Sequence, residues 1–363
     1  MPTSSSSTLE STLTRNWLRR GPLACALWPL SLLFRALSGL RYRLYLSGVF
    51  KSARLPVPVV VVGNIFIGGT GKTPLTIWLV QALQQAGLRP GVISRGHGSA
   101  DRAPRAVTAA STPQQVGDEP LLIALRTGVP VMVGRDRAAA GRALLAAHPQ
   151  VNILITDDGL QHYALQRDVE IVLFDGRGTG NGWLLPAGPL REPPSRRRDV
   201  TIVNTPQLTA ELAASVAAVR LPDAARRAGA SLDMPIQMTL AGDHAEQLRD
   251  RSQRRPLASL NQPGARLVAA AGIGNPARFF GMLRAAGLRI TELALPDHHD
   301  FLDRPFAGVD ADLILMTEKD AVKCAQIEEL RDDPRLWVVP VTARIDAALA
   351  DLIVEKCRGC SIA

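Results

Sequence analysis

The segment that decides the fold is Val57-Pro-Val-Val-Val-Val62, which runs directly into Gly63-Asn-Ile-Phe-Ile-Gly-Gly-Thr-Gly-Lys-Thr73. Its first part is rich in β-branched apolar residues and predicts a buried parallel strand. We expect a helix from Pro74 to about Ala86. A strand, a glycine-rich loop and a helix in this order are typical of a phosphate-binding loop. The sequence therefore predicts an α/β fold with a mostly parallel sheet.

The loop carries the residue types that hold nucleotide phosphates. Its glycines let backbone N–H groups turn toward phosphate oxygens, and the helix N-terminus adds a partial positive charge. We expect Lys72 to reach the β- and γ-phosphates and the Thr73 hydroxyl to bind Mg²⁺. Phe66 stands where the usual P-loop pattern has glycine, so the adjacent glycine pair is expected to supply the flexibility. The predicted ATP-binding residues are Phe66, Ile67, Gly68, Gly69, Thr70, Gly71, Lys72 and Thr73.

Two pairs of acids follow farther along the chain. A second apolar strand, predicted over 151–156, ends in Asp157 and Asp158, where a P-loop protein holds a carboxylate near Mg²⁺. One of these carboxylates can contact metal-bound water while the other faces substrate or a basic partner, and a pair of surface acids is the alternative. Asp118-Glu119-Pro120 precedes a predicted helix from Leu121 to Thr127, so helix capping alone could account for Asp118.

The net charge is concentrated at one end of the chain. The 363 residues are 46% hydrophobic and 21% charged, which excludes disorder as a whole and allows one large or two medium domains. The formal charge of +9 would favour a nucleic-acid binder. However, residues 1–55 hold eight basic residues and one acid, and the remainder is nearly neutral. We therefore expect no nucleic-acid partner.

The N-terminal segment has three possible interpretations. Residues 3–8 form a Ser/Thr run that predicts a disordered tail. Leu23 to Phe34 is apolar and uncharged, but it is shorter than the about 20 residues that span a bilayer, and Pro29 interrupts it. A signal peptide, a helix packed on the domain, and a pair of amphipathic helices in a membrane interface all fit this pattern. Its Trp, Tyr and Leu residues, interleaved with arginines, favour interfacial helices on anionic lipid.

The second half of the chain predicts a smaller α/β domain. Arg266 to Ala277 contains a strand and a G-x-G-x-x-A loop, which is similar to a dinucleotide-binding fingerprint. Pro276 lies in that loop and one nucleotide site is already assigned, so a tight turn is the better explanation. Thr317-x-x-Asp320 predicts a helix start, and Lys319 and Lys323 follow it without a role that the sequence reveals. Further strands are expected over 289–295, 312–316 and 335–341, and linker strands over 234–240 and 255–260.

The four cysteines do not indicate a disulfide framework. Cys25, Cys324, Cys357 and Cys360 are too few and too scattered for one, so a reducing compartment is expected. Cys357 and Cys360 have C-x-x-C spacing but no second pair completes a zinc site.

Eight motifs stand in an order that points to one family. They are GGTGKTP (68–74), SRGHG (94–98), VGDEP (116–120), DDGLQH (157–162), LPAGPLREP (185–193), AGIGNP (271–276), PDHH (296–299) and TEKDAVK (317–323). Over about residues 10–350 the chain resembles the tetraacyldisaccharide 4'-kinase, or lipid A 4'-kinase, family of Gram-negative bacteria. The resemblance implies transfer of the ATP γ-phosphate to the 4'-hydroxyl of a tetraacylated glucosamine disaccharide 1-phosphate. It also implies a peripheral protein at the cytoplasmic face of the inner membrane, and it favours the interfacial helices.

The resemblance also assigns roles to individual residues. Asp118 would accept the hydroxyl proton, supported by His298 or, less favoured, by His299. ATP and Mg²⁺ are the implied cofactors, and the lipid precursor and an anionic membrane surface are the implied partners, with no protein partner. The remaining residues with expected roles are Thr73, Asp157, Asp158 and Glu192 at Mg²⁺, Gln161, His162 and Arg191 in the cleft, and Arg95 at the anionic substrate or the transition-state charge.

The full expectation is a P-loop NTPase-like domain, a second smaller α/β domain and an N-terminal interfacial helical segment. The predicted boundaries are a tail and membrane-interface helices over 1–54, the P-loop domain over 55–230, hinge strands over 231–261, the smaller domain over 262–345, and a C-terminal helix and tail over 346–363. Because Asp118 and His298 fall on different domains, catalysis would require closure. The alternatives are a P-loop ATPase of the ParA or dethiobiotin-synthetase type and a membrane-attached nucleotide-binding scaffold.

Overall fold

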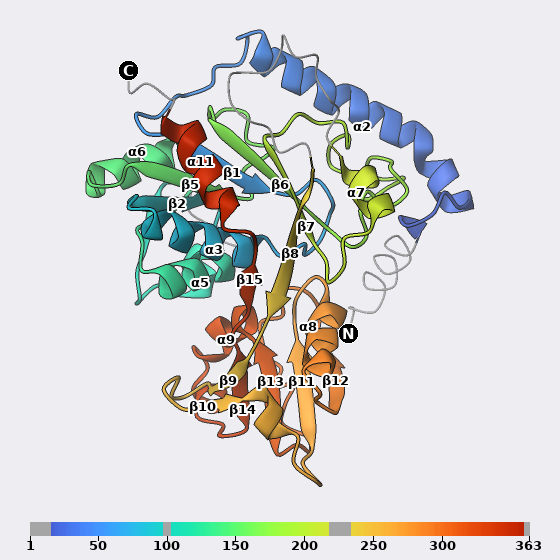
Figure 1. The fold of residues 1–363 in the computed structure, drawn as a ribbon, viewed down its shortest axis with the longest axis vertical. Helices are drawn as coiled ribbons and strands as arrows, with labels where there is room; N and C mark the ends of the chain where they lie inside the picture. The colour runs from blue at the N-terminus through green and yellow to red at the C-terminus, as the bar shows by residue number, and fades with distance from the viewer. Residues whose placement is uncertain (1–15, 97–102, 218–233, 359–363) are drawn as a thin grey trace.

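A computed structural model describes residues 16–96, 103–217 and 234–358, and it has two lobes, each built on its own sheet (Figure 1). The larger, first lobe contains nine strands in the order β15-β8-β7-β6-β1-β5-β2-β4-β3. The seven central strands run parallel, and β3 and β15 close the two edges antiparallel. In chain order the strands are β1 (Val59–Gly63), β2 (Pro90–Ser94), β3 (Arg105–Val107), β4 (Val131–Val133), β5 (Ile153–Asp157), β6 (Val169–Asp175), β7 (Val200–Asn204), β8 (Ile236–Ala241) and β15 (Thr342–Arg344).

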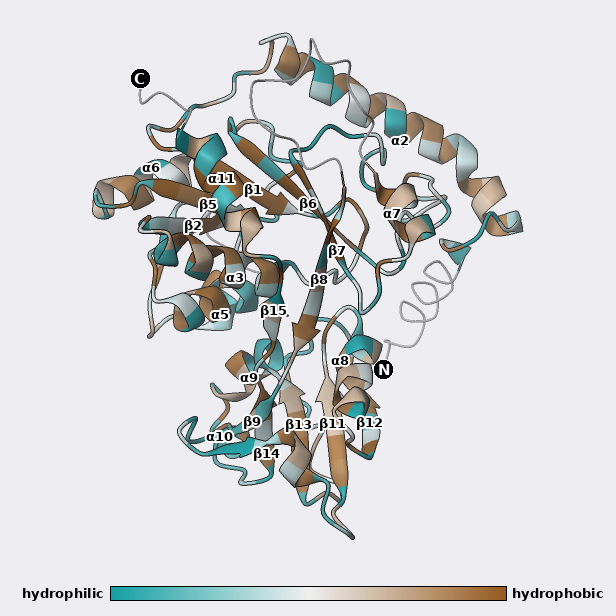
Figure 2. Ribbon diagram, in the orientation of Figure 1, coloured by the Kyte–Doolittle hydropathy of each residue, from teal (hydrophilic) through white to brown (hydrophobic). Residues whose placement is uncertain are grey.

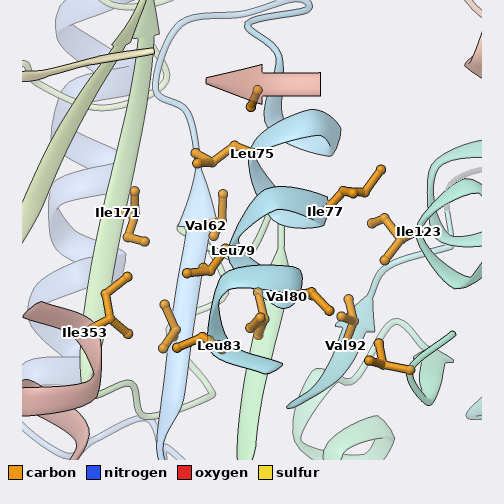
Figure 3. Close-up of a cluster of buried hydrophobic side chains, with 14 of the residues drawn as sticks. Val62, Leu75, Ile77, Leu79, Val80, Leu83, Val92, Ile123, Ile171 and Ile353 are labelled. Carbon is orange, nitrogen blue, oxygen red and sulfur yellow. The ribbon is translucent and has the colours of Figure 1, made fainter. Parts of the chain in front are cut away.

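Helices cover both faces of the first sheet. Val60 and Val62 of β1 point into a cluster formed with α3 (Lys72–Gln85), α5 (Asp118–Thr127) and α11 (Ala348–Arg358), which Figure 3 shows in close-up. Val59 and Val61 point to the other face, toward α6 (Arg137–Ala147) and α7 (Ala210–Val216). Burial on both faces explains why β1 is a continuous apolar run rather than an alternating one.

The predicted elements around the phosphate-binding loop are present with small shifts. Helix α3 begins at Lys72, two residues before Pro74, because proline is tolerated in the first turn of a helix, where its missing N–H has no partner to lose. Helix α11 packs on the first-lobe core through Leu349 and Ile353. Cys357 is buried in the same cluster, whereas Cys360 lies outside the described residues.

The second lobe is a six-stranded sheet in the order β10-β9-β14-β13-β11-β12. Strands β11 to β14 are parallel; β11, β13 and β14 are buried between two apolar clusters, whereas β12 is largely exposed at one edge. Strands β9 and β10 add an antiparallel edge on the other side. The elements are β9 (His244–Gln247), β10 (Arg254–Pro256), β11 (Leu267–Ala271), β12 (Ile290–Ala294), β13 (Leu313–Thr317) and β14 (Leu336–Val339), with helices α8 (Pro276–Ala285), α9 (Glu318–Cys324) and α10 (Glu328–Arg331).

The crossing points between the lobes differ from the predicted linker. Strand β8 belongs to the first sheet and β9 to the second, so the chain first crosses near Gly242. It returns between β14 and β15, and β15 pairs with β8 although its residues fall within the predicted smaller domain. Residues Leu257–Leu260, predicted as part of a strand, form a short 3-10 helix instead. The chain therefore passes between the lobes twice, rather than through one hinge segment.

Within the described residues, one continuous helix spans most of the segment for which the sequence predicted a pair. Helix α2 (Pro22–Leu46) has 25 residues and contains Pro29, which does not break it. The apolar pattern resumes beyond Arg35 with Leu37 and Leu40, so the helix is longer than the twelve-residue apolar stretch. By length and composition α2 could cross a membrane, and only 11% of its most apolar window is buried. Figure 2 shows hydrophobic residues along the length of α2, with hydrophilic ones between them.

Helix α2 is also docked on the first lobe along one edge. The Ser31 hydroxyl donates to the Leu184 carbonyl at 2.8 Å and accepts from the Ala187 N–H at 2.9 Å. The Trp28 and Trp183 rings and the Tyr42 and Tyr163 rings pack together. The rest of the helix exposes large apolar side chains, which are Leu23, Trp28, Leu30, Leu32, Leu33, Leu37, Leu40 and Leu46. The structure therefore combines the packed helix with an apolar face open to the outside.

Candidate active site

The phosphate-binding loop lies between β1 and α3, at the carboxyl end of the parallel sheet. Gly71 has a φ of 99°, and a Cβ added there would meet the Asn204 amide nitrogen at 2.5 Å. That amide donates to the Thr70 carbonyl at 2.9 Å, so the end of β7 holds the loop in shape. Glycine is therefore required at position 71 for both its backbone conformation and its lack of a side chain.

Lys72 is oriented by groups from two directions. Its Nζ donates to Asn64 Oδ1 at 3.2 Å and lies 3.8 Å from Asp158 Oδ1. The Asn64 amide in turn donates to the carbonyls of Phe66 and Gly68, which fixes the loop around the lysine. Asn64 and Asn204 were not predicted as site residues. Asn64 lies inside the phosphate-binding segment 63–73, and Asn204 is the last residue of β7.

Phe66 and Ile67 do not face the glycine part of the loop. The Phe66 ring is 2% exposed and lies under the Arg177 guanidinium, 4.1 Å from its carbon. The Ile67 N–H donates to the Pro189 carbonyl at 2.9 Å, and the Arg191 N–H donates to the Ile65 carbonyl. These two predicted ATP-binding residues instead join the loop to the segment 184–191, on which α2 docks.

Asp157 is buried at the end of β5, close to the loop. Its Oδ1 accepts from the Thr76 hydroxyl at 3.1 Å, one turn after Thr73 on α3, while its Oδ2 is buried without a hydrogen-bond partner. Burial, and then the nearby Glu119 and Asp158 carboxylates, raise the pKa of Asp157 to about 7, against the lowering effect of Lys72. An orphaned carboxylate oxygen with a raised pKa is the environment that a cation would relieve.

Asp158 faces the predicted cleft residue Arg191. Its Oδ2 lies 3.7 Å from an Arg191 nitrogen, and its carbonyl accepts from Arg137 at 2.9 Å. Arg95 is exposed just after β2, and its charge, with that of Arg167, acts on the buried Arg137. Arg95, Arg137, Arg167 and Arg191 thus form a group of guanidinium side chains at this end of the sheet. His97 and Gly98 of the same motif lie outside the described residues.

Glu192 and its neighbours differ from the predicted metal arrangement. One carboxylate oxygen of Glu192 accepts from Gln161 Nε2 at 2.8 Å, and the other pairs with Arg196. His162 is neutral, since burial and then the Arg137 charge lower its pKa to about 4. Within the described ranges, no three His, Cys, Asp or Glu side chains form a group that could hold a metal ion. Because its carboxylate is satisfied by Arg196 and Gln161, Glu192 does not fit the role of a Mg²⁺ ligand.

Asp118 and His298 meet across the two lobes. Asp118 is the first residue of α5, 6% exposed, and its Oδ2 lies 3.2 Å from His298 Nδ1. Burial favours the neutral carboxyl, but the hydrogen bond from His298 and the charges of Lys319 and Lys323 together hold the pKa of Asp118 well below its usual range. The same hydrogen bond raises the pKa of His298, against burial and the Lys319 charge.

The structure distinguishes the two adjacent histidines. His298 has a φ of 58°, a conformation that turns its ring toward Asp118. The His299 ring accepts from the Phe301 N–H at 3.0 Å and lies 3.4 Å from Asp303, away from Asp118. His298 is therefore the histidine that contacts Asp118, which sequence spacing alone left open.

Further contacts bring the second lobe against the phosphate-binding loop. A Cβ on Gly274 would lie 2.9 Å from the Gly69 nitrogen, so the G-x-G turn after β11 packs directly on the loop. Arg278 on α8 lies 2.9 Å from Asp175, at the end of β6. The glycines of the G-x-G-x-x-A loop, which is similar to a dinucleotide fingerprint, thus allow the two lobes to come into close contact.

Comparisons with known proteins agree with this geometry. The family model for tetraacyldisaccharide-1-P 4'-kinase matches residues 23–358. The tetraacyldisaccharide 4'-kinase of Janthinobacterium sp. (strain Marseille) is 61% identical over 361 residues, which cover 98% of this chain and 99% of that protein. The protein of the same name from Herminiimonas arsenicoxydans is 59% identical, with 98% of each chain covered.

A solved structure is also similar. LpxK from Aquifex aeolicus, in complex with ATP, has a TM-score of 0.72 and 26% sequence identity to this chain. The match covers 92% of this chain and 99% of that one, so both lobes take part in it.

Proposed function

This chain belongs to the tetraacyldisaccharide-1-P 4'-kinase family, and from that premise we propose that it transfers the γ-phosphate of ATP to the 4'-hydroxyl of a tetraacylated glucosamine disaccharide 1-phosphate. It is a kinase of lipid A biosynthesis. That membership decides against an ATPase of the ParA or dethiobiotin-synthetase type and against a scaffold without activity. The observation that carries the proposed mechanism is the contact of Asp118 with His298 beside the phosphate-binding loop.

The nucleotide phosphates are proposed to lie in the loop from Gly68 to Thr73. The Ile67 N–H is already bonded to Pro189 and the Phe66 ring is buried, so the cradle begins two residues later than the sequence predicted. Lys72, held by Asn64, supplies a positive charge to the β- and γ-phosphates. The amino end of α3 adds its dipole. ATP binding is further supported by the similar structure of LpxK with ATP.

Thr73 and Asp157, with Asp158 beside them, are proposed to hold Mg²⁺. Mg²⁺ is commonly bound by one or two carboxylates together with water and substrate phosphates, so a cluster of three protein acids is not needed. The unpartnered Oδ2 of Asp157 fits this role. When bound, the ion would neutralise charge between the β- and γ-phosphates. Glu192 is left out of this set because its carboxylate is engaged by Arg196 and Gln161.

Asp118 and His298 are proposed to take the proton of the acceptor hydroxyl. A sugar hydroxyl has a high pKa, so a base in hydrogen-bond reach must accept its proton as the new phosphorus–oxygen bond forms. Asp118 is ionised and oriented by His298, and the raised pKa of His298 lets it hold the proton after transfer. The pair acts as one unit because its two members face each other at 3.2 Å.

The anionic 1-phosphate of the substrate is proposed to meet the guanidinium group around Asp158. Arg95 is exposed, and Arg191 is partly exposed beside Asp158, so both can reach a bound anion. Arginine binds phosphate through paired N–H donors. Gln161 and His162 lie on the turn that follows Asp158, and Arg41 of α2 donates to the Gln161 carbonyl at 3.3 Å. This end of the sheet therefore lies next to the apolar helix.

Helix α2 is proposed to lie against the cytoplasmic face of the inner membrane. Its exposed leucines provide the apolar surface, and Arg35, Arg41 and Arg43 provide charges for anionic lipid head groups. A lipid substrate with four acyl chains stays in the bilayer, so the enzyme has to approach it there. With α2 docked beside the turn at Gln161, a membrane bound to α2 would lie near the proposed acceptor side of the site.

The proposal is tested by incubating purified protein with ATP, Mg²⁺ and the tetraacylated disaccharide 1-phosphate in detergent micelles. We expect the lipid to gain the mass of one phosphate, at the 4' position. A lipid of unchanged mass, with ATP hydrolysed to ADP, would instead indicate an ATPase.

A further inference from the structure

Two lysines of the second lobe approach the carboxylate of Asp118. Lys319 Nζ lies 3.8 Å and Lys323 Nζ 3.6 Å from Asp118 Oδ2, the same oxygen that His298 faces. Both lysines belong to α9, which packs against α5 at the lobe contact. Three nitrogen groups from one lobe therefore surround a single carboxylate oxygen of the other.

Lys323 is buried and has few other partners. Lys323 has a side chain only 8% exposed, and its Nζ forms no hydrogen bond in the described part of the chain. It lies 3.7 Å from Asp320 and 5.5 Å from the centre of the Phe301 ring. A buried ammonium without hydrogen bonds is costly, so a purely structural position would favour an apolar residue.

Asp320 does not neutralise this cation fully. Its Oδ2 accepts from the Gly272 N–H at 2.9 Å and from the Thr317 hydroxyl at 2.7 Å, and burial raises its pKa despite these bonds and the lysine charges. The charge of Lys323 therefore acts on Asp118, at 3.6 Å, as well as on Asp320, at 3.7 Å.

Lys319 joins acids from both lobes. Its Nζ donates to Glu119 Oε1 at 3.1 Å and lies 3.8 Å from both Asp118 and Asp297. Asp297 is also 4.0 Å from His298 Nε2, so one ammonium lies near two carboxylates that face the histidine. Helix α9 is fixed in this place by Arg126, which donates to Glu318 at 2.5 Å.

We infer that Lys319 and Lys323 are positioning residues that set the charge of the Asp118–His298 pair, so that Asp118 stays ionised and the acceptor proton comes to rest on His298. This inference rests on the proposed function for its catalytic meaning. Both cations stabilise the Asp118 carboxylate, and Lys319 also opposes the imidazolium form of His298, which limits how strongly His298 is protonated before the substrate binds. A lobe movement that separates α9 from α5 would remove this control.

The first test measures the pKa of His298 directly and does not depend on turnover. The chain has six histidines, so the His298 signal can be assigned in an NMR titration by comparison with H298Q. In K319M the pKa of His298 should rise, because Lys319 lowers it in the native protein, and in K319R it should stay close to the native value. An unchanged pKa in K319M would overturn the inference while leaving the proposed kinase activity intact.

The second test is the pH profile of kcat/KM, with a matched control. Lys356 pairs with Asp199 at 3.1 Å and is 15% exposed, and Lys319 pairs with Glu119 at 3.1 Å and is 16% exposed. Asp199, however, lies at the amino end of β7, opposite the carboxyl ends of the strands where the site lies. K319M should lose about 10-fold in kcat/KM near neutral pH. The acid limb of its pH profile should move to higher pH, and its activity should recover at high pH. K356M should keep the native profile. A loss in K319M that appears only as a raised KM for ATP would overturn the inference, since Lys319 would then bind nucleotide.

Discussion

The phosphate-binding loop and the Asp118–His298 pair perform adjacent tasks but are built in different ways. The loop is one contiguous segment, held by local bonds such as those of Asn64 to Phe66 and Gly68. The pair joins residues 180 positions apart on two lobes and depends on the packing of α9 against α5. The first region therefore survives any change that keeps β1 and α3 in place, whereas the second requires the correct arrangement of both lobes.

The largest effect is expected at Lys72. K72A should lose about 10³-fold or more in kcat/KM, because the charge of Lys72 acts on the transferred phosphate throughout the reaction. ATP affinity should fall as well, which isothermal titration calorimetry would measure. Native ATP affinity in K72A would mean that the loop binds phosphate without its lysine. It would contradict the role of Lys72 in nucleotide binding.

Asp118 should show the opposite pattern. D118A is expected to lose about 10²- to 10³-fold in kcat while keeping ATP affinity close to native, because Asp118 contacts His298 and the lysines rather than the loop. D118N keeps the side-chain shape while removing the carboxylate, so it separates the loss of the proton acceptor from the cavity that D118A leaves. Equal losses of turnover and ATP binding in D118N would make Asp118 a structural residue.

A third region, helix α2, should affect only the lipid substrate. Leu33 and Leu37 are 57% and 59% exposed, and L33E/L37E should reduce binding to anionic vesicles and lower activity on vesicle-bound lipid about 10-fold. Leu125 on α5 is also 57% exposed, so L125E is the matched control and should bind vesicles like the native protein. Equal vesicle binding by both variants in a sedimentation assay would refute the membrane role of α2.

The smallest effect is expected at the start of α9. The Thr317 hydroxyl accepts from the Asp320 N–H at 3.2 Å and donates to the Asp320 carboxylate. T317A should lower the free energy of unfolding by about 1 kcal/mol, measured in urea, and T317S should restore it. We also expect a greater loss of kcat than of ATP affinity in T317A, since α9 carries the lysines but not the loop. The reverse order would contradict the separation of the two regions.

The sequence predicted those features that depend on neighbours in the chain. Strand β1, the glycine loop and α3 follow from a short pattern, and the capping of α9 by Thr317 follows from residue spacing. The acids at the end of β5 could be placed at the sheet edge for the same reason. Their detailed contacts could not, because Thr76 and Lys72 reach Asp157 and Asp158 from another element.

The rest depended on contacts that no local pattern encodes. The choice between His298 and His299 is made by the direction of each ring, and the satisfaction of Glu192 by Arg196 and Gln161 appears only in the folded chain. The edge position of β15 could not be predicted because its partner β8 lies about a hundred residues earlier. The length of α2 could not be predicted because a proline inside a helix usually ends or kinks it, whereas α2 continues through Pro29.

The central claim is that Asp118 and His298 act as one unit across the lobes, and a double-mutant cycle on kcat tests it most directly. The cycle compares D118A, H298A and D118A/H298A at saturating ATP and lipid. Residues that act together are strongly non-additive, so the double variant should be no slower than the slower single variant, within about 3-fold. Losses that multiply in the double variant would show two independent residues and would contradict the account.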